Sequence, residues 1–128
     1  MASQLKVDSI TGVTTAGSIS VTGEGNSTTT NLQQGLAKAW ANGTATATVN
    51  DSFNVSAGTD HGTGDYSYSF INNLDSADMV ANITCAQNAN SIGVNNGRRA
   101  TSFDVKMFTD SGSLADRDHG CVVHGDLA

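Results

Sequence analysis

The sequence predicts an all-β fold, an antiparallel, jelly-roll-like β-sandwich with a short N-terminal β-strand appendage. Short apolar–polar alternations recur along the 128 residues, and Asn-, Asp- and Gly-rich stretches separate them. Half-buried strands alternate in this way, and turns use those residues. Apolar residues make up 38% of the chain and aromatic residues 5%, whereas a helical bundle would need more Leu, Glu and Lys.

Residues 1–34 are predicted to be an attachment or shaft segment that ends in a linker. Residues 5–10 and 18–21 alternate as half-buried strands do, and residues 23–30 have the composition of a flexible polar tether. An isolated pair of strands is barely stable in water. This segment is therefore expected to pack on another copy of itself or on a larger body.

Residues 35–128 are predicted to form the sandwich domain. Strands are expected at 37–41, 46–55, 66–70, 79–85, 103–107 and 120–124, with turns at 72–73, 88–90, 95–97 and 110–112. A helix over 32–40 competes with the first strand, although Gly35 and its short length weaken it. So little core material favours burial of further surface between copies of the chain.

Composition also limits the partners. The formal charge of −6 argues against nucleic acid and anionic membrane surfaces. No segment approaches the roughly 20 apolar residues of a membrane span, so membrane insertion is not expected. Cys85 and Cys121 fit neither a zinc pattern nor a disulfide framework. We expect both thiols to be buried and reduced. A disulfide between them is the alternative if the two strands are neighbours.

The stretch TDHGTGDYSYSF, residues 59–70, places charged residues around two glycines. It lacks the lysine of a phosphate loop and the final glutamate of a calcium loop. We therefore expect a hairpin turn that feeds a strand. Asp60, His61 and Asp65 could face a receptor from this turn. Arg98 and Arg99 form a basic loop that could bind an anionic sugar or simply be solvated.

Neither a catalytic residue nor a cofactor nor a metal site is predicted, and we do not expect an enzyme. His119 and His124 are five positions apart on one strand, so they should point to opposite faces. One histidine from each of three chains could still meet on a threefold axis. Trp40 is expected in the core or stacked on a sugar. The full set predicted for the core or a subunit interface is Trp40, Phe53, Tyr66, Tyr68, Phe70, Phe103, Val105, Met107, Cys121 and Val123.

Three stretches carry a resemblance to a known family. Residues 35–70 contain K-A-W, then DSFNVS, then a glycine turn followed by GDYSYSF. This part resembles the C-terminal domain of small fibre and appendage proteins of tailed phages, many of them marine. CVVHGD, residues 121–126, is similar to the family's closing strand, and LKVDSITG, residues 5–12, resembles the strand that begins many phage fibre proteins. The resemblance fades between residues 74 and 112.

The resemblance implies a β-rich, trimeric virion component without catalytic residues. We expect a small fibre that is assembled in the host cytoplasm, attaches to other virion proteins through residues 1–34 and contributes to adhesion to host-surface polysaccharide. A capsid decoration (cement) or head-fibre protein is the alternative. A carbohydrate-binding module with calcium is a third reading, with Asp60 and Asp65 joined by Asn72 or Asn73 as ligands.

Overall fold

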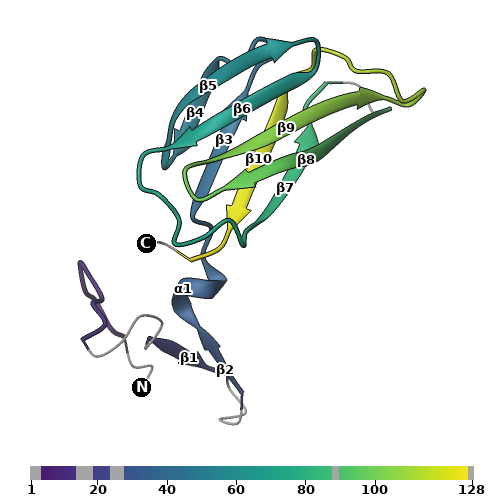
Figure 1. The fold of residues 1–128 in the computed structure, drawn as a ribbon. Helices are drawn as coiled ribbons and strands as arrows, with labels where there is room; N and C mark the ends of the chain where they lie inside the picture. The colour runs from purple at the N-terminus through teal and green to yellow at the C-terminus, as the bar shows by residue number, and fades with distance from the viewer. Residues whose placement is uncertain (1–3, 14–18, 24–27, 88–89, 127–128) are drawn as a thin grey trace. The chain divides into compact units, whose positions relative to one another are not determined.

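The computed structural model describes residues 4–13, 19–23, 28–87 and 90–126. The chain divides into two compact units, residues 1–36 and 37–128. The predicted all-β class is confirmed. The second unit holds two four-stranded antiparallel sheets, consistent with a β-sandwich, and the first holds a two-stranded sheet (Figure 1).

The first unit is small. β1 (Ser20–Thr22) pairs antiparallel with β2 (Thr29–Asn31). α1 (Leu32–Gly35) follows directly, and the Asn31 Oδ1 atom accepts a hydrogen bond from the Gln34 N–H at 3.1 Å. Asparagine at this position satisfies a backbone donor that a helix start leaves free. The helix that competed for residues 32–40 is therefore reduced to one turn.

The strand predicted at residues 5–10 is absent, and that expectation was wrong. The described residues 4–13 form no strand, and the side chains of Leu5, Val7 and Ile10 are 82%, 54% and 59% exposed. A strand needs a neighbour for its backbone groups, and β1 and β2 pair only with each other. The alternating pattern is present in the sequence, but residues 4–13 pair with none of the strands in the described structure.

The sandwich consists of two sheets of four strands. The strands of the first sheet, in spatial order, are β4 (Val49–Phe53), β3 (Ala39–Gly43), β10 (His119–His124) and β7 (Val80–Cys85). The strands of the second sheet, in spatial order, are β5 (Val55–Gly62), β6 (Asp65–Phe70), β9 (Ser102–Thr109) and β8 (Ser91–Arg99). All neighbouring strands run antiparallel.

The connections explain how one chain builds both sheets. β3 and β4 form one hairpin and β5 and β6 another, and Asn54 alone joins β4 to β5 across the sheets. The last four strands follow a Greek-key order, because β10 returns to lie beside β7 after β8 and β9 (Figure 1). A jelly roll contains two Greek keys. Only the second half of this sandwich follows such a path.

Asn54 is the corner at which the chain changes sheets. Its φ of 57° lies in the left-handed region, which asparagine tolerates better than most residues. The buried side chain donates from Nδ2 to the carbonyls of Lys38 and Asn72 at 3.0 Å each, and its Oδ1 accepts from the Asn72 N–H at 2.7 Å. The amide thus ties together three segments that meet at the corner.

Two strands were missed or misplaced by the sequence pattern. β5 was expected only as the end of a strand over 46–55, and β8 was not expected at all. The turn predicted at residues 95–97 lies inside β8, where the register shifts between Asn95 and Gly97 as in a β-bulge. Gly97 packs against the Asp104 side chain, where a Cβ would not fit. Asn95 and Gly97 therefore belong to a β-bulge here and not to a turn.

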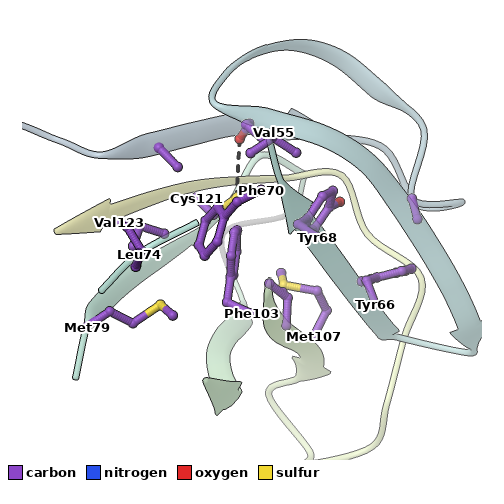
Figure 2. Packing of buried hydrophobic residues seen from close by; sticks show 14 residues of the cluster. Val55, Tyr66, Tyr68, Phe70, Leu74, Met79, Phe103, Met107, Cys121 and Val123 are labelled. Atoms are coloured by element: carbon purple, nitrogen blue, oxygen red, sulfur yellow. Dashed lines mark hydrogen bonds between the residues drawn. The ribbon is translucent and has the colours of Figure 1, made fainter. Parts of the chain in front are cut away.

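The core lies between the two sheets (Figure 2). β6 and β9 supply the large rings: Tyr68 stacks on Phe103 with ring centroids 5.5 Å apart, and Phe70 lies 5.6 Å from Phe103. The opposite strands β3 and β10 supply the smaller Ala39, Ala41, Cys121 and Val123. Large side chains on one sheet thus meet small ones on the other, which allows dense packing.

The two cysteines are free thiols, as expected, but only Cys121 is buried, whereas Cys85 is half-buried. They lie on the neighbouring strands β7 and β10, but Cys121 is paired in register with Ile83 and not with Cys85. The Cys121 thiol donates to the Ala41 carbonyl at 3.5 Å (Figure 2). Burial raises the pKa of this thiol to about 12, so it stays protonated and acts as a small apolar group.

Candidate binding surface

Residues 59–70 form the predicted turn and strand. Gly62 and Gly64 have φ values of 125° and 63°, in a region that glycine adopts without cost. The Asp60 Oδ1 atom accepts from the Gly62 N–H at 2.9 Å and so braces the turn. The Gly64 N–H donates to Asp116 Oδ1 at 2.7 Å, which ties the turn to the segment before β10.

The charged residues of this turn do not converge. Asp65 Oδ2 accepts from Lys106 Nζ at 2.7 Å, in a half-buried ion pair with the neighbouring strand β9. His61 Nε2 lies 2.9 Å from Ser67 Oγ on the exposed surface. The Asp60 side chain accepts its hydrogen bond from Gly62, within its own turn. Each of the three side chains therefore has a local partner, and the turn presents them separately.

Arg98 and Arg99 lie at the other end of the same sheet and are also separated. The Arg98 Nη1 atom donates to the Met79 carbonyl at 3.0 Å, and the Arg99 Nη1 atom donates to Asp104 Oδ1 at 2.8 Å. The Asp104 carboxylate raises the pKa of Arg99. Successive residues of a strand point to opposite faces. The two guanidinium groups therefore do not form a joint anion site.

The calcium ligand set suggested by the sequence is not assembled. Within the described ranges, no three His, Cys, Asp or Glu side chains are grouped so that they could hold a metal ion. Asn72 follows the far end of β6 from Asp65, and its N–H donates to Asn54. A six-residue strand is about 20 Å long, too far for Asp65 and Asn72 to share one ion.

A polar cluster is buried inside the sandwich. His119 is fully buried, whereas His124 points outward, so the two histidines face opposite sides as expected. His119 Nδ1 lies 2.8 Å from the Arg117 carbonyl and Nε2 lies 2.8 Å from Tyr68 Oη. A carbonyl only accepts, so Nδ1 carries the proton and Nε2 of the neutral ring accepts from the tyrosine hydroxyl.

Burial keeps this cluster neutral. Desolvation lowers the pKa of His119, although the Arg117 carbonyl favours the cation. The Tyr66 ring stacks on His119 at 4.8 Å, and its hydroxyl donates to the Ala45 carbonyl at 3.1 Å. Burial raises the pKa of Tyr66 to about 12 and raises that of Tyr68 as well. The cluster joins β6, β10 and residue 45, and its role is to hold the sandwich together.

Eight of the ten residues predicted for the core or an interface are buried, but Trp40 and Phe53 are not in the core. Their side chains are 38% and 53% exposed. On β3 the buried residues are Ala39, Ala41 and Gly43, so Trp40 must point outward. Phe53 lies two residues before Val55, and a continuous strand over 46–55 would place both side chains on the same face. The left-handed turn at Asn54 breaks that alternation, so Val55 points inward and Phe53 outward.

Trp40 and Phe53 belong to one row of outward side chains. Because Trp40 pairs with Phe53 and with Val122, and Val122 pairs with Asn82, the row crosses all four strands. A second row lies two residues along the strands. There Asn42 pairs with Asp51 and with Gly120, and Gly120 pairs with Thr84. We call these two rows the aromatic face; its members are Phe53, Trp40, Val122, Asn82, Asp51, Asn42, Gly120 and Thr84.

The aromatic face combines apolar and hydrogen-bonding groups. Strands lie about 4.8 Å apart and a row lies about 7 Å from the next, so each ring has an amide, hydroxyl or carboxylate within reach. Gly120 contributes no side chain, and a Cβ built there would meet only Thr84 Oγ1, at 3.1 Å. The Thr84 hydroxyl donates to the Gly120 carbonyl at 3.3 Å, so the Thr84 side chain lies against Gly120, and the row is lowest between Asn42 and Thr84.

An open groove of about 610 Å³ lies where the edge strands β7 and β8 face each other. Its lining comes from residues 77–81 and 95–98. The guanidinium of Arg98 donates across this groove to the Met79 carbonyl and so links the two edges. The Arg98 side chain in this groove is already hydrogen-bonded within the fold. The aromatic face is therefore the better candidate for a binding surface.

The sequence pattern identified the aromatic residues of this face but not their direction. The signal was available in residues 37–41, where Trp40 stands between small residues. Reading Ala39 and Ala41 as the buried positions would have placed Trp40 outward. The polar members Asn42, Asp51, Asn82 and Thr84 had no such signal, because only the strand register brings them into one row.

Comparison with family models, with curated proteins and with solved structures found no match. In the described part of the chain, none of the helices has the length and apolar character needed to cross a membrane.

Proposed function

We propose that this chain is a structural protein of a tailed-phage virion, a small homotrimeric fibre that contributes to adhesion to the host surface. The N-terminal unit attaches it to other virion proteins, and the jelly-roll-like sandwich faces outward. The resemblance of residues 35–70 and 121–126 to phage fibre domains supports the class. The acidic character of the chain supports a protein that stays soluble on a particle surface.

One observation carries the proposal. The described residues 4–13 present Leu5, Val7, Ile10 and Val13 to solvent, with Val13 94% exposed. Four large apolar side chains in so short a segment are costly in water and mark a surface that is covered by a partner. The alternating pattern of residues 5–10 suits addition to a sheet edge of another chain, where main-chain hydrogen bonds and alternate side chains both contribute.

The alternative within the same class is a capsid decoration or head-fibre protein. A tail fibre gains reach from a long shaft. The described residues of the N-terminal unit contain a two-stranded sheet and a one-turn helix, which is short for a shaft. The alternative places the protein close to the particle surface, where it could also stabilise the head.

The proposal is tested on particles of the phage whose genome encodes the chain. Antibody raised against the full chain should label purified particles in electron micrographs. Particles grown with the triple variant Leu5→Ser, Val7→Ser and Ile10→Ser should lose that label, because the segment no longer offers apolar side chains to a partner. The matched control is Ile71→Ser, which removes an exposed side chain from the sandwich unit.

The two arms of this experiment separate the possible failures. Unlabelled wild-type particles would contradict the virion assignment. Full labelling of the triple variant would leave the virion assignment in place but contradict the attachment role of residues 5–10. Purified variant chain should melt within a few degrees of wild type, which checks that loss of label reflects lost attachment.

A further inference from the structure

We propose that the aromatic face binds a neutral polysaccharide. This inference deepens the proposed function, on which it rests, because it assigns the adhesive surface and the class of receptor. The sequence singled out the turn at residues 60–65 and the arginine pair, and the structure gives each of those side chains a partner within the fold. The aromatic face instead leaves its rings open to solvent.

The first argument is the combination of chemical groups. Sugars present apolar C–H faces and a rim of hydroxyl groups, so a sugar site needs an aromatic surface beside donors and acceptors. Trp40 and Phe53 lie directly opposite each other on neighbouring strands, and Asn42 and Asp51 form the adjacent opposite pair. Asparagine both donates and accepts, and a carboxylate accepts from hydroxyl groups. The face therefore supplies both kinds of contact side by side.

The second argument is shape. The row from Phe53 to Asn82 crosses four strands, a width of about 14 Å, which exceeds a single sugar ring and suits an extended chain. In the second row, Gly120 carries no side chain between Asn42 and Thr84. A sugar ring stacked on Trp40 can place its hydroxyl groups over Gly120, where a larger side chain would lift them away.

The third argument is charge, which decides between neutral and anionic sugars. The four strands of this sheet contain neither lysine nor arginine, and Asp51 is an acidic member of the face. The chain as a whole carries a formal charge of −6. An acidic polysaccharide would be repelled by the Asp51 carboxylate and by the net charge of the chain. A neutral glycan satisfies the same contacts without that cost.

The polar row also argues against a second copy of the chain as the occupant. The buried centre of a subunit interface is depleted of charged residues. Here Asp51 and Asn42 lie immediately beside the aromatic pair, and closing two copies over them would desolvate the Asp51 carboxylate. An occupant that carries hydroxyl groups instead supplies the hydrogen bonds that these side chains lose from water.

The test uses the tryptophan fluorescence of the full chain, because Trp40 is its single tryptophan. The probes are dextran, mannan, galactan and laminarin, with alginate as the anionic comparison. We expect at least one neutral polysaccharide to shift the emission in a saturable way and alginate to leave it unchanged. Affinity electrophoresis through gels that contain the same polysaccharides gives the retardation of variants that lack the reporter.

Three variants locate the site. Trp40→Ala and Phe53→Ala should each weaken retardation by about tenfold or more, as expected when a stacking ring is lost. Gly120→Val should also weaken it, because the larger side chain would lift the sugar hydroxyl groups away. The control is Ile92→Ala, which removes an exposed apolar side chain from β8 of the other sheet and should bind as wild type does. Trp40, Phe53 and Ile92 are exposed and Gly120 is half-buried, and unchanged far-UV circular dichroism confirms that the variants fold.

Several outcomes overturn the proposal. They are the absence of any response to the four neutral probes, a stronger response to alginate, and retention of full binding by both aromatic variants. Conversion of trimer to monomer by Trp40→Ala in light scattering would identify the face as a subunit contact instead. None of these results affects antibody labelling of particles. The sugar site can therefore fail while the virion assignment stands.

Discussion

At the scale of single residues, the fold depends on a few buried polar side chains that hydrogen-bond groups from separate segments of the chain. Asn54 turns the chain between sheets and satisfies three backbone groups there. His119 fills the space beneath Tyr66 and links Tyr68 to the Arg117 carbonyl. A buried polar group is costly unless it is paired, and both residues are fully paired.

The buried histidine predicts how stability depends on pH. Burial lowers the folded-state pKa of His119 below its ordinary value of 6.5. Below pH 6.5, His119 becomes protonated in the unfolded chain but stays neutral in the folded chain, so protonation favours unfolding. The free energy of unfolding should therefore be fully retained above pH 6.5 and fall as the pH decreases from there. The slope approaches about 1.4 kcal/mol per pH unit for one proton.

Urea denaturation between pH 7.5 and pH 5 measures this dependence. His119→Gln keeps an amide that can bond Tyr68 and Arg117 but cannot titrate, so we expect lower stability at pH 7.5 and a smaller loss on acidification. His61→Gln, which changes an exposed histidine, should keep the wild-type slope. Equal slopes in wild type and His119→Gln would show that the buried ring is not the group that titrates.

At the scale of elements, the sandwich relies on close approaches that glycine permits. Gly58 of β5 lies against the backbone of residue 47 and the ring of Tyr68, and a Cβ at this position would overlap both. Ala47 itself has a φ of 58° and is buried. The loop between β3 and β4 thus folds over β5, and glycine at position 58 is what allows the contact.

Replacing this glycine gives a direct test of the packing. Gly58→Ala should lower the free energy of unfolding by about 2 kcal/mol or more, because a rigid backbone contact must shift. Gly125→Ala places its Cβ at ordinary contact distances of 3.4 Å or more and should cost little. Thermal unfolding of both variants checks the difference. If the two variants melt alike, the loop does not rest on β5 as described.

The sequence pattern predicted strands where apolar residues alternate strictly and failed where polar residues occupy a strand. Residues 66–70 and 103–107 alternate and coincide with β6 and β9. β8 was missed because its Asn95, Asn96 and Gly97 resemble a turn, while its bulge is fixed by pairing with β9. Residues 5–10 alternate but form no strand, since pairing also needs a neighbour that sequence patterning does not reveal.

The candidate site shows the same limit. The pattern singled out Trp40 and Phe53 by residue type and misjudged their direction, because alternation gives two faces but does not say which one is buried. The aspartates and arginines stood out as charges, and local hydrogen bonds within the fold account for them. The polar row beside Trp40 depends on register between four strands that are distant in sequence, and no local signal reports such a register.

At the scale of the whole molecule, the two units have different roles in the proposed fibre. The N-terminal unit exposes apolar side chains that need a covering partner, and the sandwich exposes an aromatic face beside hydrogen-bonding groups. Neither feature would stabilise a solitary monomer, and both suit a protein that is anchored at one unit and binds through the other. Trimerisation would add avidity to weak sugar contacts, since several sites engage one polysaccharide.

The most direct measurement of the central claim is an image reconstruction of the intact phage particle. The proposed function predicts three copies of the sandwich around a threefold axis, attached through their N-terminal units, with the sheet that contains β3 and β10 accessible from outside. The position of this density on the tail or the head would decide between a tail fibre and a head-fibre or decoration protein. A reconstruction in which no density accommodates the sandwich, from particles that lack the chain by mass spectrometry, would contradict the account.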